Sequence, residues 1–166
     1  MLYCFFYRKL KKGAKNNRPS LRLRNGEYMK IVVIDGQGGR MGALLCEKLR
    51  KAQKDLPSDT LLCAIGTNSA ATAAMLKAGA DCAATGENPV LVACRDADFI
   101  IGPLGILAAD SLMGEVTPAM AVAVGSSAAQ KLLLPVNRCN HHVVGVQDYS
   151  MSRLTDEAVQ ELLSFF

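Results

Sequence analysis

The 166-residue sequence contains no tryptophan, and only 5% of its residues are aromatic. No stretch is long and apolar enough to span a bilayer, which excludes an integral membrane protein. Half of the residues are nevertheless hydrophobic, mostly alanine, valine, isoleucine and leucine. This composition favours a helix-covered sheet, and the length fits one domain with a substantial core.

Several signatures of catalysis and metal binding are also missing. The sequence has no Gly-x-Ser-x-Gly elbow, no Walker lysine and no Cys-x-x-Cys pair, which argues against a serine hydrolase, a Walker-type nucleotidase and a structural zinc site. The six cysteines are Cys4, Cys46, Cys63, Cys82, Cys94 and Cys139. Most of them have apolar neighbours, so we interpret them as reduced thiols of a cytoplasmic protein.

Positive charge is concentrated at one end of the chain. Residues 1–28 hold eight basic residues and one acid, whereas residues 29–166 hold 11 basic residues and 14 acids. The second segment is mildly acidic, which gives no case for nucleic-acid binding. We expect residues 1–28 to be either a disordered basic extension or a leader translated from a start codon set too early. Residues 29–166 are predicted to form a single domain.

A strand, a glycine loop and a helix follow one another at the start of that domain. Residues 31–34 are four consecutive apolar residues, typical of a buried strand, and four glycines occur within residues 36–42. Residues 39–54 then show helical spacing of apolar residues. This order is typical of the first unit of a nucleotide-binding βαβ fold. A tight turn that binds nothing is the alternative.

Strands and helices alternate along the rest of the sequence. Further strands are predicted at 60–65, 80–84, 98–101, 131–136 and 143–146, and further helices at 70–78, 90–97, 106–113, 117–127 and after 155. Expected helix starts are Asn68 or Ser69, Asn88, Thr117 and Thr155. The alternation predicts a three-layer, Rossmann-like α/β fold, with a parallel sheet of order 3-2-1-4-5, the sixth strand at an edge and helices on both faces.

In such a sheet, ligands bind beyond the carboxyl ends of the strands, where the glycine loop lies. The candidate ligand-binding residues are Gly36, Gln37, Gly38, Gly39, Arg40, Gly42, Thr67, Asn68 and Arg138. Asp35 either caps loop amides or binds Mg²⁺, and we favour the cap. Thr67 and Asn68 stand where NAD-binding domains usually carry an acid. This weakens the case for NAD and leaves NADP, a mononucleotide or another phosphorylated ligand open.

Two residues are weak catalytic candidates. Glu87 is a possible acid or base, with a solvated helix start as the alternative, and Cys139 is a possible nucleophile, with a packed structural cysteine as the favoured alternative. His141 and His142 are adjacent and would point to opposite faces of a strand. We therefore predict no metal site.

Two family resemblances follow from these motifs. Residues 36–42 (Gly-Gln-Gly-Gly-Arg-Met-Gly) resemble the loop of dihydrodipicolinate reductases, which bind NAD(P)H. The Pro-Ser-Gly-Thr segment and the lysine of those enzymes are absent. Residues 33–39, 66–69, 73–80, 84–88 and 137–140 are similar to a small bacterial family known only as a domain of unknown function. That resemblance implies a domain from Met29 onward and no established activity.

The sequence thus predicts a cytoplasmic protein that binds a nucleotide or a small phosphorylated metabolite. The cofactor is left open, with NAD(P) and a mononucleotide as candidates, and no membrane partner is expected. The alternative is a non-catalytic ligand-sensing or assembly module, acting as a homodimer or other homo-oligomer. Residues 102–117 are expected to form either a second wall of the site or, through the apolar run 104–107, a dimer seam.

Overall fold

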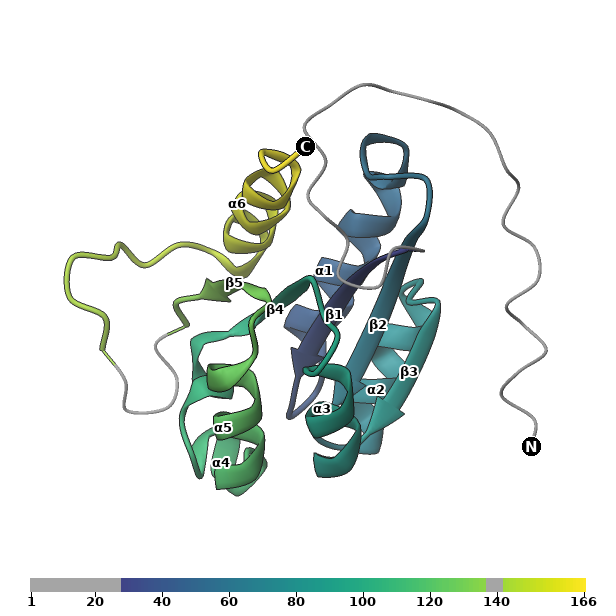
Figure 1. Cartoon of the computed structure of the whole chain (residues 1–166). Helices are drawn as coiled ribbons and strands as arrows, with labels where there is room; N and C mark the ends of the chain where they lie inside the picture. Colours follow the sequence, from purple (N-terminus) through teal and green to yellow (C-terminus); the bar gives the residue numbers. More distant parts are fainter. Residues whose placement is uncertain (1–27, 137–141) are drawn as a thin grey trace, which may run out of the picture.

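The structure is a computed structural model that describes residues 28–136 and 142–166. Its strands are β1 (Met29–Asp35), β2 (Thr60–Gly66), β3 (Cys82–Thr85), β4 (Phe99–Pro103) and β5 (Gln130–Leu134). They form one parallel sheet of order β3-β2-β1-β4-β5 (Figure 1). The predicted Rossmann-like α/β fold and its strand order are confirmed.

Helices cover both faces of this sheet (Figure 1). The helices are α1 (Arg40–Lys51), α2 (Ser69–Lys77), α3 (Glu87–Ala93), α4 (Ser111–Gly114), α5 (Pro118–Ser126) and α6 (Met151–Leu163), with short 3-10 turns η1 (Gln53–Asp55) and η2 (Leu104–Leu107). Alternate residues of β1 belong to two separate hydrophobic cores, one on each face of the sheet. Ile31 and Val33 pack with α1, α2 and α6, whereas Val32 and Ile34 pack with α3 and α5. Burial on both faces explains why β1 has no polar alternation.

Helix boundaries depend on short polar side chains, and several match the prediction. Asn68 caps α2 by accepting from the Ala71 amide at 2.9 Å. Thr117 caps α5 by accepting from the Met120 amide, with Pro118 at the first helical position. Gly79 follows the end of α2 at φ +109°, a backbone conformation that glycine adopts without a Cβ penalty.

The sixth strand that we predicted at 143–146 is wrong. Gly145 has φ +84°, and the Val146 amide donates to the Val143 carbonyl at 3.4 Å. A turn therefore replaces the extended conformation that a strand needs. Within residues 28–136 and 142–166, the sheet has five strands.

Three predicted helix starts or spans also need correction. Helix α6 is capped by Ser150, not Thr155, whose buried hydroxyl bonds back to the Met151 and Ser152 carbonyls. Helix α3 begins at Glu87, and its N-cap is Gly86, two residues before the expected cap Asn88. The helix expected over 106–113 is instead η2 followed by the short turn α4.

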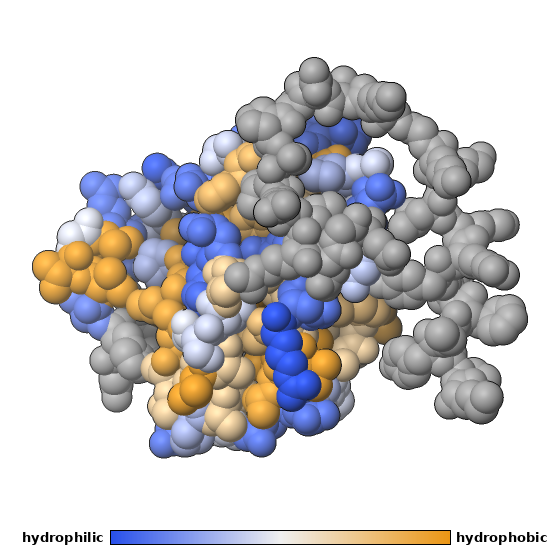
Figure 2. All heavy atoms as spheres, viewed as in Figure 1, coloured by the Kyte–Doolittle hydropathy of each residue, from blue (hydrophilic) through white to orange (hydrophobic). Residues whose placement is uncertain are grey.

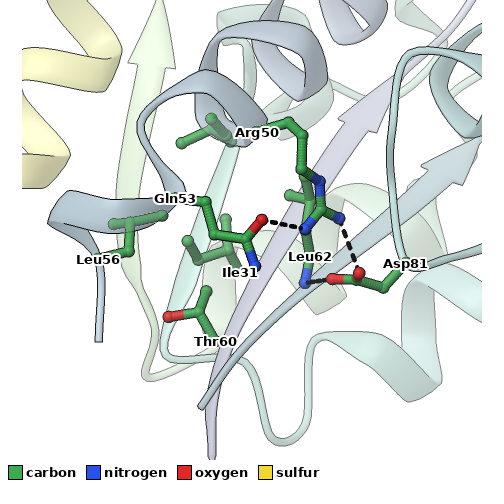
Figure 3. Close-up of a pocket in the computed structure, with 8 residues that line it drawn as sticks. Ile31, Arg50, Gln53, Leu56, Thr60, Leu62 and Asp81 are labelled. Carbon is green, nitrogen blue, oxygen red and sulfur yellow. Dashed lines mark hydrogen bonds and ion pairs between the residues drawn. The ribbon is translucent and has the colours of Figure 1, made fainter. Parts of the chain in front are cut away.

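The amino-terminal edge of the sheet is closed by a polar network around Arg50 (Figure 3). Arg50 donates to Asp81 at 2.7 Å and to Gln53 at 3.0 Å, and Asp81 accepts from the Leu62 amide at 2.8 Å. The hollow beside these residues measures about 10 Å³. That volume suits a single water at most, so this hollow offers no room for a metabolite.

No helix in the described part of the chain has both the length and the apolar character needed to cross a membrane.

Candidate functional site

Asp35 is the buried end of β1 and organises the glycine loop. Its carboxylate accepts from the Gly36 amide at 2.8 Å and from the Gly42 amide at 2.6 Å. Burial raises the pKa of Asp35, although bonds from loop amides lower it in part and the nearby Glu115 adds to the rise. Asp35 therefore acts as a cap for loop amides, the interpretation that the sequence favoured.

Two loop glycines are required by close packing. Gly39 has φ +66°, and a Cβ there would lie 2.5 Å from Ala71 Cα. A Cβ on Gly42 would lie 2.8 Å from Asp35 Cβ. These glycines let α1 approach β1 and α2 closely, as expected for this kind of loop. Gly38 is different, because a Cβ there would meet no atom of residues 28–136 or 142–166 within 4 Å.

A cavity of about 180 Å³ opens beside the loop at the carboxyl edge of the sheet. Its lining consists of Asp35, Gly36, Gln37, Gly38, Gly39, Arg40, Met41, Pro103, Gly105, Leu112, Val136 and Met151. The glycine loop is one wall. The opposite wall is formed by Pro103 at the end of β4, by Gly105 in the turn that follows, by Val136 just after β5 and by Met151 at the start of α6. Part of the expected second wall at 102–117 is therefore present.

The glycine loop that lines this cavity includes backbone amides with no protein acceptor in the described part of the chain. Among the described residues, no protein oxygen accepts from the Gly38 or Arg40 amides. The Arg40 side chain is exposed and makes no ion pair within the same part of the chain. Arg40 is the first residue of the 12-residue helix α1, and Gly38 directly precedes its N-cap Gly39. The helix dipole favours an anion at this end of the helix. The arrangement suits a phosphate or carboxylate group.

Glu115 is a central residue that the sequence did not reveal. One of its oxygens, Oε2, accepts from the Gln37 amide at 2.8 Å, from Asn68 Nδ2 at 2.9 Å and from the Thr67 hydroxyl. Burial alone would raise the pKa of Glu115, but these three hydrogen bonds outweigh it and hold the pKa below its ordinary value. Glu115 thus joins the loop after β1 to the loop after β2.

The predicted site residues fall into distinct groups in the structure. Gly36, Gln37, Gly38, Gly39 and Arg40 line the cavity, and Gly42 lies beneath the loop against Asp35. Thr67 and Asn68 are adjacent to the loop but bind Glu115. No local sequence pattern pointed to Glu115. Its contacts with Gln37, Thr67 and Asn68 depend on the turn at 110–114, which brings it to the loop.

Of the two catalytic candidates, Glu87 lies apart from this cavity and Cys139 lies outside the described residues. Glu87 is exposed and accepts from the Thr117 hydroxyl at 2.5 Å, and it does not line the cavity. Arg138, Cys139 and His141 lie outside the described residues, and His142 is exposed. In the part of the chain that the structure describes, no group of three histidine, cysteine or acidic residues could hold a metal ion.

Comparison with known proteins gives one clear result. The family model described as a domain of unknown function, DUF3842, matches residues 30–166. The chain belongs to the DUF3842 family. No curated protein and no solved structure matches the chain. The resemblance of the DUF3842 glycine loop to dihydrodipicolinate reductases therefore stays a prediction.

Proposed function

We propose that this DUF3842 protein binds a nucleotide or another phosphorylated metabolite at the carboxyl edge of its sheet. The observation that carries this proposal is the cavity of about 180 Å³ lined by six consecutive loop residues, 36–41. Two amides in that loop and the Arg40 side chain are free of protein acceptors in the described part of the chain. A phosphate group would satisfy these donors without disturbing the fold.

The second wall of the cavity supports a ligand site over a simple structural turn. Pro103, Val136 and Met151 come from three separate segments and face the loop across the cavity. A turn that only connects β1 to α1 needs no such wall. Apolar walls with a few polar groups are typical of small-molecule sites. The proposal concerns binding and assigns no reaction.

A thermal-shift screen tests the proposal. The protein would be heated with NAD(H), NADP(H), ATP, GTP and a set of sugar phosphates. A ligand at a hundredfold excess over its Kd stabilises the fold by about 2.7 kcal/mol. We expect at least one compound to raise the Tm. An intact fold with no shift from any of them would contradict the proposal.

An assembly module is the second candidate function, and exposed apolar side chains favour it. Val122 on α5 is 67% exposed, and Val144 in the segment before α6 is 88% exposed. Figure 2 shows apolar surface over both regions. Self-association would cover such surface, so we propose a homodimer as the associated form. Sedimentation equilibrium should then give twice the mass of the chain, whereas a monomer mass at high concentration would count against assembly.

A further inference from the structure

Glu115 lies between the two loops that a dinucleotide would have to span. In dinucleotide-binding folds, the pyrophosphate lies on the first glycine loop and a ribose lies at the end of the second strand. Gln37 belongs to the first of these places in this protein, and Thr67 and Asn68 belong to the second. All three donate to the same oxygen of Glu115. A protein carboxylate therefore takes donors that a ligand would otherwise use.

We propose that Glu115 determines the size of the ligand that the glycine loop accepts. Its carboxylate fills the subsite at the ends of β1 and β2. Only the cavity toward Pro103, Val136 and Met151 is left, and it suits a compact ligand of the sugar phosphate class. This inference rests on the proposed function and narrows it, because it excludes dinucleotides as ligands of the wild-type protein.

Close packing leaves no space for a ribose between Glu115 and the loop. A Cβ built on Gly36 would lie 2.7 Å from Glu115 Oε2 and 2.9 Å from Leu112 Cδ1. Leu112 is buried, at 8% exposure, and lines the cavity. The turn that carries Glu115 is thus seated directly on the glycine loop.

The turn itself adopts an unusual backbone to place Glu115. Asp110, Leu112 and Met113 all have left-handed φ values, of 60°, 53° and 63°. L-residues adopt this conformation only at a cost in free energy, and this kind of strain is common at ligand clamps. The Asp110 amide closes the turn by donating to the Val116 carbonyl at 2.8 Å. Packing of Leu112 and the three bonds to Glu115 offset the strain.

The distribution of charge separates the two sides of the loop. Glu115 is acidic, so a second phosphate near the end of β2 would face its carboxylate. Arg40 lines the open cavity together with the buried Asp35, and Glu115 does not. A single phosphate bound beside Gly38 and Arg40 would lie near the positively charged Arg40 side chain. The cavity of about 180 Å³ is also smaller than the roughly 300–1,000 Å³ of sites for drug-sized ligands.

Calorimetric titration of the full chain with ribose 5-phosphate, NADH and NADPH tests this inference. We expect the wild-type protein to bind ribose 5-phosphate and to show no measurable affinity for the dinucleotides. Glu115→Ala should gain affinity for at least one dinucleotide by tenfold or more, because Gln37, Thr67 and Asn68 become free to donate. Glu47→Ala is the matched control, since it removes an equivalent charge from the exposed face of α1. It should bind as the wild type does.

The outcomes separate the inference from the function on which it rests. Binding of NADH or NADPH by the wild type, or no gain in Glu115→Ala, would overturn the size limit while leaving phosphate binding in place. Failure of all three compounds to bind either protein would count against both. Glu115→Ser also shortens the side chain and empties the subsite. If Glu115→Ala does not fold, the same tenfold gain is required of Glu115→Ser, and its absence would overturn the inference.

Discussion

At the scale of single residues, two adjacent glycines of the loop have different structural roles. Gly39 has a left-handed backbone and contacts Ala71, whereas Gly38 has open space at its Cβ position. We expect Gly39→Ala to lower the free energy of unfolding by at least about 1–2 kcal/mol, from the left-handed conformation alone. Gly38→Ala should change it by less than about 1 kcal/mol. Urea denaturation of both variants checks this, and equal destabilisation would contradict the loop geometry.

The lowered pKa of Glu115 gives a second residue-scale prediction, on pH dependence. Its pKa in the folded protein lies below its ordinary value of 4.5. The ionised carboxylate therefore stabilises the fold above that value, and this stability is lost as the pH falls through the folded pKa. We expect the stability advantage of the wild type over Glu115→Gln to be largest near neutrality and to shrink below about pH 4.5. Urea unfolding of both proteins at several pH values measures it.

If the free energy of unfolding differed between those two proteins by the same amount at every acidic pH, the proposed hydrogen bonds to the ionised Glu115 would be contradicted. Asp35 is the acidic neighbour that complicates the comparison, because burial raises its pKa. Its ionised form destabilises the fold, so its effect on the pH profile has the opposite sign. Asp35 is present in both proteins, and subtracting one profile from the other removes most of its contribution.

At the scale of elements, the two strands β2 and β3 bring a pair of cysteines together. Cys63 and Cys82 are register partners, and their sulfur atoms lie 2.7 Å apart. The hydrogen bond between them raises the pKa of Cys63 and lowers that of Cys82. The thiols of Cys46 and Cys94 are buried, which raises their pKa values to about 12 and about 11. Among these four cysteines, Cys82 is therefore the one that most readily forms a reactive thiolate.

Treatment with the oxidant diamide should join Cys63 to Cys82. The two thiols lose two protons and two electrons and their sulfurs form a bond, while the azo group of diamide takes up those protons and electrons and becomes a hydrazine. Peptide mass spectrometry should find this linkage, with Cys46 and Cys94 still open to alkylation after unfolding. Cys82→Ser is the control and should form no link at Cys63. Full alkylation of both cysteines after oxidation would contradict the strand register.

Most elements could be predicted from the sequence because local signals agreed with the tertiary structure. The apolar run 31–34, the caps Asn68 and Thr117, and Gly79 all have local causes. The sixth strand failed because Gly145 adopts a positive φ that apolar neighbours do not reveal. Thr155 failed as a cap because Ser150 satisfies the helix start five residues earlier.

The site was harder to predict than the fold for a physical reason. The loop residues 36–40 are contiguous, so their glycine pattern was visible. Glu115 reaches the loop across 78 residues of sequence, through a turn with three left-handed non-glycine residues. Non-glycine residues rarely adopt that conformation, and sequence patterns therefore gave no reason to place Glu115 beside Gln37.

At the scale of the whole molecule, the cavities described at the two ends of the strands differ in volume. The amino edge is closed around Arg50 and Asp81, and its hollow measures about 10 Å³, whereas the carboxyl edge holds a cavity of about 180 Å³. The glycine loop and Arg40 line the larger of these two spaces. We therefore propose the carboxyl edge as the place of binding, as in parallel sheets generally.

The most direct test of this account is the thermal-shift screen repeated on Gly38→Ala. The added methyl group would enter the open space beside the glycine loop, where no atom of the described residues lies within 4 Å. Gly125→Ala is the control, because a Cβ there makes only ordinary contact, at 3.9 Å from Leu107 Cδ2. We predict that a phosphorylated compound raises the Tm of the wild type and of Gly125→Ala, and that Gly38→Ala folds normally but loses the shift. An equal shift in Gly38→Ala, or no shift in the wild type, would contradict the account.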